Sequence, residues 1–296
     1  MSSPVDKRRS PHWVASVVIP AHNEAGVIAA TLDVLLGDAE PGEFEVIVVA
    51  NGCADRTAAI ARSKVGVRVI ETTRAGKAAA LRLGDAECSA FPRLYLDADV
   101  RISATSVREM VRALQAPKME ACAPTVVWGV DECTTLARRA HHAHCSLYAP
   151  HRGLAGVGGY MLSEAGHRRV FPIPDIIADD EWVHRHFALH ERCTVKSAQS
   201  VTRAAPNFRA MVRRRARARA GNRELDSLGI RSACPAFGMR DLVRSVRGRH
   251  LLAVDALCFG GVVLADRLLT GWRTCSSKDA EWSTDRHVAR PKTPEG

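Results

Sequence analysis

Short apolar runs in the first third of the sequence alternate with segments whose apolar residues recur at helical spacing. The apolar runs are Val14–Pro20, Phe44–Val49, Val67–Ile70 and Arg93–Leu96, and the helical segments are Val27–Leu36, Arg56–Lys64, Lys77–Leu83 and Ser106–Leu114. Unbroken β-branched runs are typical of strands that are buried on both faces. Strands that alternate with helices form βαβ units with parallel pairing. The sequence therefore predicts an α/β fold with a mostly parallel sheet flanked by helices.

The second half of the sequence is less regular. It predicts a strand over Ala121–Val130, helices over Leu136–Tyr148, Glu181–Leu189 and Arg209–Arg219, and a glycine-rich loop over Gly153–Gly159. No internal repeat accompanies these elements, so a repeat architecture is not indicated.

Composition fits one large domain with appendages. The chain has 296 residues, of which 46% are hydrophobic, enough to bury a sizeable core. Its nine cysteines are scattered, odd in number and without a C-x-x-C pair, which argues against a disulfide framework and a zinc ribbon. The polar, basic N-terminus is not followed by the apolar region of a secretory signal peptide. We therefore expect a cytoplasmic protein.

Positive charge is confined to one part of the sequence. The chain carries a formal net charge of +10, and residues 201–250 alone contain thirteen arginines against Glu224, Asp226 and Asp241. The rest of the chain is therefore close to neutral. A generally basic surface for nucleic acid is not indicated, and a single basic segment instead suggests phosphate ligands or an anionic membrane surface.

Two carboxylates follow the fourth predicted strand directly. Asp97 and Asp99 form a D-x-D step at the point where Arg93–Leu96 ends. Ligands bind at the carboxyl ends of strands in open α/β sheets. Carboxylate oxygens are the ligands that Mg²⁺ and Mn²⁺ prefer, and these ions leave room for substrate phosphates. The step therefore predicts a divalent cation site.

Six segments between Val14 and Arg219 together resemble the family-2 glycosyltransferases of GT-A fold. They are, in order, VVIPAHNEAGVI, VVANGCADRTAAIA, GKAAALRLG, YLDADV, GVGGYMLS and DDEWVHR. The resemblance implies a GT-A domain over 13–200, with a Rossmann-like nucleotide-sugar half at 13–115 and an acceptor and catalytic half at 116–200. An arginine-rich and apolar helical extension follows at 201–274. The polar segments 1–12 and 275–296 are expected to be disordered tails.

The resemblance also implies the donor site. Its residues would be Pro20, Ala21, Glu24, Asn51, Asp55, Gly76, Lys77, Asp97 and Ala98, with Asp99 as the Mg²⁺ or Mn²⁺ ligand. Asn51 stands where the family usually has an aspartate that reads uracil, so base recognition is retained and the preference for uridine is weakened. Asp55 also suits the N-cap of the following helix, and that alternative stays open.

On the acceptor side the resemblance points to a glycine loop and an acidic run. Gly156, Gly158, Gly159 and Trp182 would line the acceptor pocket. Aligned on Trp182–Arg185, Asp179 falls on the catalytic aspartate of the family and Asp180 comes one residue later. Either acid could instead cap the helix that starts there.

Two arginines on one helical face are a further candidate for the donor diphosphate. Arg213 and Arg217 lie at positions i and i+4, and a guanidinium pair suits bidentate phosphate recognition. A solvated basic face or a contact with lipid headgroups is the alternative. The family's Q-x-x-R-W motif, which holds the diphosphate in processive relatives, is absent.

Two other features are interpreted as structural. His141, His142 and His144 lack a companion ligand at zinc spacing, so packing or surface exposure is the favoured interpretation. Leu251–Trp272 is long enough to span a bilayer, but each charge of Asp255 and of Asp266 would cost about 2.5–3.5 kcal/mol near the membrane centre. A packed or interfacial helix is therefore expected, with peripheral membrane contact as the second choice.

Together these observations predict an inverting, metal-dependent glycosyltransferase. It would move a single sugar from a nucleoside-diphosphate sugar, with UDP the first choice, to a hydroxyl of a small-molecule or lipid acceptor, with no nucleic acid as partner. A sugar nucleotidyltransferase is the first alternative, but it would need a glycine-rich loop after the first strand, where Pro20–Asn23 stands. A non-catalytic nucleotide- or RNA-binding protein is the second, and the arginine segment lacks the aromatic residues for base stacking.

Overall fold

The computed structural model describes residues 13–148, 153–232, 239–248 and 251–273, so the predicted tails at 1–12 and 275–296 lie outside the described residues. Within them one eight-stranded sheet runs in the order β3-β2-β1-β4-β7-β6-β8-β5. Its strands are β1 Ala15–Ala21, β2 Phe44–Asn51, β3 Val67–Thr72, β4 Arg93–Leu96, β5 Arg101–Ile102, β6 Ala121–Gly129, β7 Gly159–Leu162 and β8 Arg192–Arg203.

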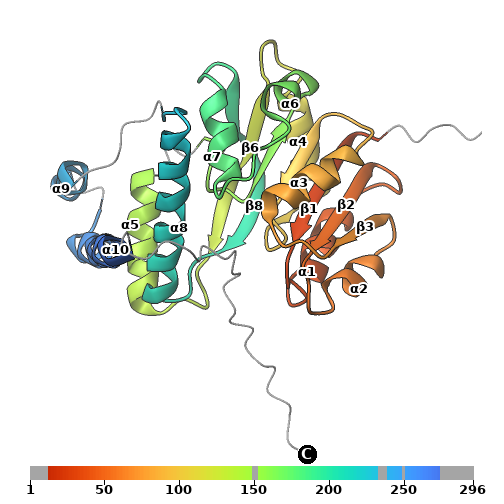
Figure 1. Cartoon of the computed structure of the whole chain (residues 1–296). Coiled ribbons are helices and arrows are strands. Elements are labelled where there is room, and N and C mark those ends of the chain that lie inside the picture. The colour runs from red at the N-terminus through yellow and green to blue at the C-terminus, as the bar shows by residue number, and fades with distance from the viewer. Residues whose placement is uncertain (1–12, 149–152, 233–238, 249–250, 274–296) are drawn as a thin grey trace, which may run out of the picture.

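Helices cover both faces of this sheet and extend beyond it at one end (Figure 1). They are α1 Ile28–Leu36, α2 Thr57–Arg62, α3 Lys77–Ala86, α4 Ala104–Ala113, α5 Thr135–Tyr148, α6 Glu164–Val170, α7 Asp179–His186, α8 Phe208–Ser227, α9 Met239–Arg247 and α10 Ala253–Arg273.

The parallel half of the sheet consists of β1, β2, β3 and β4. β1 pairs in parallel with both β2 and β4, and β2 pairs in parallel with β3. Every residue of β1 and β2 is buried, which explains why these strands are apolar except at Ser16, Glu45 and Asn51. This arrangement places the carboxyl ends of β1, β2 and β4 at one edge, as the strand–helix alternation predicted.

The second half of the sheet is mixed. β7 lies antiparallel to both β4 and β6, while β6 and β8 run parallel and β5 closes the edge against β8. The apolar pattern did not indicate β8, because small polar residues such as Ser200 and Thr202 occupy buried positions along it. The predicted α/β fold with flanking helices and a helical extension is confirmed.

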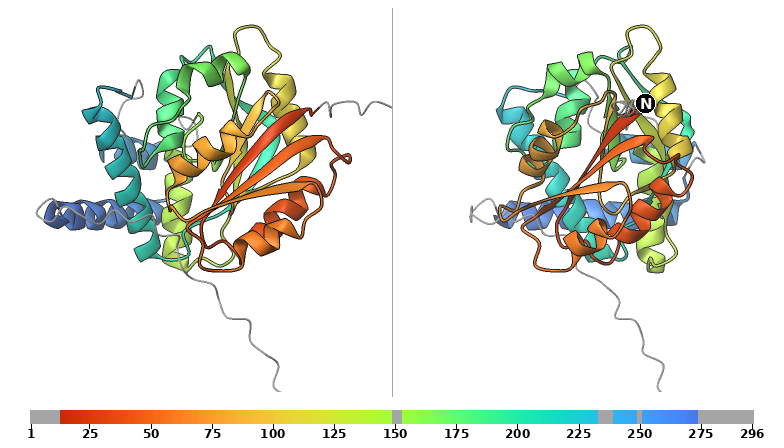
Figure 2. Two further views of the ribbon diagram at one scale, coloured as in Figure 1. Left: turned by 45° about the vertical axis from the view of Figure 1, so that its right-hand side comes forward. Right: turned by 90° about the vertical axis from the view of Figure 1, so that its right-hand side faces the viewer.

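The helical extension has its own apolar core. α10 packs along α5 and α8, and residues of all three helices bury side chains in one cluster that includes Ala140, Met211, Phe259 and Val262. Figure 2 shows α8, α9 and α10 at the end of the molecule remote from α1 and α2. Within the described residues, no helix combines the length and the apolar character needed to cross a membrane.

Candidate active site

Three charged side chains from distant parts of the chain meet at the carboxyl edge of the parallel strands. Lys77 begins α3, Asp97 follows β4, and Asp179 begins α7. The Nζ atom of Lys77 lies 2.7 Å from Oδ1 of Asp97 and 2.9 Å from Oδ1 of Asp179. One ammonium group therefore links the predicted donor residues to the predicted catalytic acid.

Asp179 is the more buried of the two candidate bases. Only 4% of its side chain is exposed. Burial raises its pKa to about 6, an effect that Lys77 opposes and that the charges of Asp180 and Asp97 reinforce. A carboxylate with such a pKa is ionised at neutral pH and can still accept a proton effectively.

Lys77 stays charged within this cluster. Burial alone would lower the pKa of Lys77, but the carboxylates of Asp179 and Asp97 raise it above its usual value. The site therefore holds a fixed cation between two acids.

Asp180 has a different environment from its neighbour. Its Oδ2 accepts a hydrogen bond from the backbone N–H of Gly156 at 2.6 Å, and its Oδ1 accepts one from the N–H of Glu181 at 2.8 Å. Asp180 thus fixes the glycine loop to the start of α7, while Asp179 faces Lys77. The two acids, which the sequence could not separate, have distinct surroundings.

The glycine loop approaches the D-x-D step closely. The carbonyl of Gly158 accepts a hydrogen bond from the N–H of Asp97 at 2.9 Å. Gly158 has a φ of +76°, and a Cβ atom there would lie 2.4 Å from Val100. Only glycine fits this position, since a side chain would be strained and would push the loop away from the acids.

Helix α7 is held in place from α8. The side chain of Arg185 is 3% exposed and donates to Glu181 at 2.9 Å, to Asp226 at 2.8 Å and to Asn222 at 2.9 Å. A Cβ atom on Gly221 would lie 2.6 Å from Ala178, so α8 also contacts the residue before Asp179 directly. No role was predicted for Arg185, and its hydrogen bonds to α7 and α8 show that it positions the acidic run.

Arg82 supports the loop before the acidic run from the other side. Its guanidinium donates to the carbonyl of Ile173 at 2.6 Å and to Asp175 at 2.5 Å. These contacts give Arg82 a structural role.

Four carboxylates gather on the donor side. Burial, followed by the charges of Asp99, Asp97 and Asp55, raises the pKa of Glu24 to about 8. Burial and then the charge of Asp97 likewise raise the pKa of Asp99. These acids destabilise each other's ionised forms, and a divalent cation among them would relieve that repulsion. Asp99 and its neighbours therefore suit such an ion in their chemistry, but among the described residues their ligand atoms do not come together as a preformed metal site. The role of Asp99 as metal ligand stays a prediction.

The arginines of α8 differ in their partners. Arg213, Arg214 and Arg217 are all exposed on the helix. Nη1 of Arg214 donates to the carbonyl of Arg203 at 3.0 Å, and the charges of Arg214 and Lys77 partly offset the raised pKa of Asp99. Arg215 and Arg219 pair instead with Asp266 of α10. Arg214 is therefore a further candidate for a donor phosphate, and the predicted role of Arg213 and Arg217 stays a prediction.

Asn51 makes structural hydrogen bonds beside the predicted donor site. Its side chain is fully buried. Its Nδ2 donates to the carbonyl of Ala21 at 2.8 Å, and its Oδ1 accepts from the N–H of Gly76 at 3.0 Å. Both ends of the amide are thus engaged with the residues after β1 and β3. The predicted contact of Asn51 with the nucleotide base stays a prediction.

Two other predicted residues also make structural contacts. Asp55 accepts hydrogen bonds from the N–H groups of Thr57 at 3.0 Å and Ala25 at 3.1 Å. The N-cap position of α2 is Arg56, however, so the expectation that Asp55 caps this helix is wrong by one residue. Trp182 donates from its indole N–H to the carbonyl of Val170 at 3.1 Å, bracing α7 on α6. The predicted direct roles of Asp55 and Trp182 in ligand binding remain predictions.

A small pocket opens between the two halves of the site. It is lined by Pro20, Lys77, Leu81, Tyr95, Leu96, Asp97, Gly158, Gly159, Tyr160, Asp179 and Asp180. Tyr160 was not predicted from the sequence. Its hydroxyl is buried and has no hydrogen-bond partner among the described residues. A buried hydroxyl without a partner is costly, so a ligand in this pocket would supply the missing bond.

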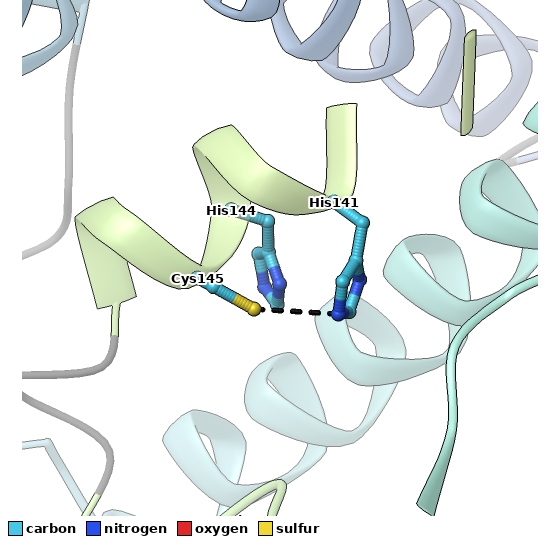
Figure 3. Close-up of side chains that lie close together, drawn as sticks. All are labelled: His141, His144 and Cys145. Atoms are coloured by element: carbon cyan, nitrogen blue, oxygen red, sulfur yellow. Dashed lines mark hydrogen bonds between the residues drawn. The ribbon is translucent and has the colours of Figure 1, made fainter. Parts of the chain in front are cut away.

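The histidines of α5 form a separate cluster (Figure 3). Nε2 of His141 lies 3.3 Å from Sγ of Cys145, and His144 points to the same place. One ligand atom from each of the three residues lies within 4.8 Å of the others, so the cluster could hold a metal ion. The sequence pattern missed Cys145, which is one helical turn from His141. His142 points elsewhere and pairs with Asp255.

Comparisons with known proteins agree with this fold and site. The model of glycosyl transferase family 2 matches residues 16–169, more than half of the chain. The chain therefore belongs to glycosyl transferase family 2, and it is a glycosyltransferase, as predicted. No curated protein sequence matches it.

Solved structures show the same fold at low sequence identity. A mannosyltransferase from Pyrobaculum calidifontis in complex with GDP-Man and Mn²⁺ has a TM-score of 0.56 and 18% identity, over 93% of this chain and 85% of that one. Glucosyl-3-phosphoglycerate synthase from Mycobacterium tuberculosis, in complex with Mn²⁺, UDP-glucose and phosphoglyceric acid, has a TM-score of 0.52 and 20% identity, over 75% and 82%. These similarities confirm the predicted GT-A fold.

Proposed function

We propose that this glycosyltransferase moves one sugar from a nucleoside-diphosphate sugar to a hydroxyl of a small-molecule or lipid acceptor, with inversion at the anomeric carbon. The observation that carries the proposal is the contact of Lys77 with both Asp97 and Asp179. Through this contact, one lysine side chain joins the D-x-D step to Asp179, a buried acid whose pKa suits it to accept a proton. The donor half would comprise residues 13–115 and the acceptor half residues 116–200.

The donor side would hold Mg²⁺ or Mn²⁺ at Asp99, with Asp97 and Glu24 close by. The raised pKa values of Glu24 and Asp99 support a cation there, because these acids repel one another. When bound, the ion would act as a Lewis acid toward the leaving diphosphate. Arg214 would add a second positive charge on the same side. Both solved relatives described above contain Mn²⁺ with a nucleotide sugar.

The acceptor side would use Asp179 as general base. Its carboxylate would take the proton of the acceptor hydroxyl as that oxygen forms a bond to the anomeric carbon. The bond from that carbon to the diphosphate oxygen breaks in the same step, and the electron pair leaves with the nucleoside diphosphate. Lys77 would keep Asp179 ionised and oriented until the acceptor arrives. Asp180, fixed to Gly156, would hold the acceptor loop.

The proposal also covers which nucleotide base the sugar donor carries. UDP is our first choice from the family motifs, although the two solved relatives bind GDP-Man and UDP-glucose respectively. Because the Asn51 amide is engaged with backbone groups, base selection would depend on the loops around Ala21 and Gly76.

Thermal shift measurements with UDP, GDP and ADP, each with and without Mn²⁺, test the donor proposal. A ligand that binds only the folded state raises the apparent melting temperature. We expect UDP with Mn²⁺ to give the largest increase and Asp99→Asn to abolish its metal-dependent part. If no nucleoside diphosphate stabilises the protein in the presence of Mn²⁺, the donor proposal is wrong. Release of pyrophosphate instead of a nucleoside diphosphate during turnover would indicate a nucleotidyltransferase.

A further inference from the structure

Helix α10 exposes a second apolar face in addition to the one that it buries with Phe259 and Val262. Its two described acids, Asp255 and Asp266, are 2% and 0% exposed. Its aliphatic residues Leu257, Leu264 and Leu268 are instead 76%, 59% and 63% exposed. A helix on the surface of a globular protein normally buries its leucines and exposes its acids.

Ion pairs with two neighbouring helices fix this orientation. Asp255 accepts from Nη1 of Arg139 at 3.1 Å and lies 2.9 Å from Nδ1 of His142, both on α5. Asp266 pairs with Arg219 and, at 3.5 Å, with Arg215, both on α8. Rotating α10 to bury its leucines would break these pairs and leave their charges unmatched. Because breaking buried pairs is strongly unfavourable, the apolar face is held outward.

The exposed aliphatic residues form one continuous stripe. Val254, which is 43% exposed, joins the three leucines. At 100° per residue these four positions fall within an arc of about 80° on one side of the helix. Leu252, just before the helix, is 62% exposed and extends the stripe at its N-terminal end. We call these five residues the α10 stripe.

The exposed charges described on α9 and α10 are positive. Arg244 and Arg247 are exposed on α9, and Arg267 is exposed beside the α10 stripe. Both described acids of α10 are buried and pair with side chains of α5 and α8. An apolar stripe with a cationic border matches the surface of an anionic bilayer, where acyl chains lie beneath negative headgroups.

We propose that the α10 stripe docks on the surface of an anionic lipid bilayer, with α10 lying parallel to the membrane plane. The leucines would enter the boundary between headgroups and acyl chains, while Arg244, Arg247 and Arg267 contact the headgroups. α5 and α8 would cover the opposite side of the helix, as they do in the structure. The proposal does not depend on the proposed catalytic function, because none of these residues lines the catalytic pocket.

Vesicle flotation of the full-length protein tests this surface. The probes are phosphatidylcholine vesicles with and without about one-third phosphatidylglycerol. We expect binding to the anionic vesicles that weakens as salt is raised, since the arginines act through screened charge. Leu257→Glu with Leu264→Glu should weaken that binding at least about tenfold.

A matched control variant shows whether a loss of binding comes from the α10 stripe or from the added negative charge alone. Val65 and Leu189 are 94% and 81% exposed on other parts of the surface, and replacing both with glutamate changes the net charge equally. This control should float like the wild type. Nucleotide-induced thermal shifts should be unchanged in both double variants, which keeps this test distinct from that of the catalytic site.

Three results would overturn the proposal. The first is wild-type protein that fails to float with anionic vesicles. The second is an equal loss of binding in the two double variants. The third is a wild-type dimer in light scattering that Leu257→Glu with Leu264→Glu converts to a monomer, without vesicle binding in either form. That third result would assign the α10 stripe to a contact between two copies of the chain.

Discussion

A largely buried aspartate lies at each end of helix α3, and the two aspartates have different numbers of hydrogen-bonding and charged partners. At its start, Lys77 is the single cation in contact with both Asp97 and Asp179. At its end, Asp85 receives hydrogen bonds from Tyr95 at 2.6 Å and Arg93 at 2.6 Å, and lies 3.0 Å from Nε2 of His167.

The pKa values follow this difference. Burial raises the pKa of Asp179 to about 6, because one lysine shared with a second acid does not compensate fully. Burial would also raise the pKa of Asp85, but the hydrogen bonds from His167, Tyr95 and Arg93 hold it below its usual value. A buried acid with too few partners suits proton transfer, whereas one with a full set of partners suits structure.

The largest expected effect is on transfer by Asp179→Asn. A base acts only on the reacting proton, so its loss should lower kcat by about 10²–10⁴ while donor affinity stays near that of the wild type. Steady-state kinetics with calorimetry of UDP binding would measure both quantities. Asp180→Asn is the matched control and should lose less activity. If Asp180→Asn is inactive and Asp179→Asn is active, Asp180 is the general base. If both variants are active, the acidic run serves only as a helix cap and the base lies elsewhere.

Asp85→Asn should affect stability instead of transfer. Removing one partner of a buried pair leaves the charge of Arg93 uncompensated, which costs about 3 kcal/mol of unfolding free energy. Urea denaturation would measure the loss, and the affinity for UDP should be unchanged in the folded variant. A normal stability together with impaired transfer would show that the two ends of α3 do not differ as described.

The two ends should also respond to pH with opposite signs. The pKa of Asp179 is about 6 in the folded protein against an ordinary value of 3.8, so the folded state binds more protons between these values. Its contribution to stability therefore falls as pH rises from about 4 to about 6. Asp85 has a lowered pKa, so its contribution is present above about pH 4 and is lost as pH falls through the folded pKa.

Urea denaturation of the wild type, Asp179→Asn and Asp85→Asn across this pH range would separate the two contributions. Asp179→Asn should remove the decrease in unfolding free energy between about pH 4 and about pH 6. Asp85→Asn should remove part of the decrease in unfolding free energy at acid pH. In the wild type, kcat/KM should rise with pH through about 6 as Asp179 ionises. A flat rate profile there would argue against Asp179 as the base.

The smallest effects are expected for a facing pair of tyrosines. Tyr95 and Tyr160 are partners across β4 and β7, but the hydroxyl of Tyr95 bonds to Asp85 and that of Tyr160 has no partner among the described residues. Tyr95→Phe should lower the unfolding free energy by about 1–2 kcal/mol and leave transfer unchanged. Tyr160→Phe should leave stability near that of the wild type and weaken transfer by up to about tenfold. Equal behaviour of the two variants would remove Tyr160 from the ligand site.

Local sequence pattern determined the parallel half of the fold and the position of the D-x-D step. The strands β1 and β2 are buried on both faces, so their apolar runs are long and unmistakable. Asp97 and Asp99 follow β4 directly, so their place at the carboxyl edge follows from the strand itself. β8 was missed because polar residues occupy three of its buried positions, Arg192, Ser200 and Thr202, and so interrupt the apolar pattern.

Tertiary structure alone decided which of the polar residues work together. Lys77 and Asp179 are far apart in sequence, and only the packing of α7 against α8 and the glycine loop brings them together. Contacts between other elements engage the Asn51 amide with Ala21 and Gly76. The packing of α10 on α5 and α8 likewise turns Asp255 and Asp266 toward Arg139 and Arg219. Helical and strand periodicities describe only neighbours within one element, whereas burial and ion pairing depend on the elements that pack against it.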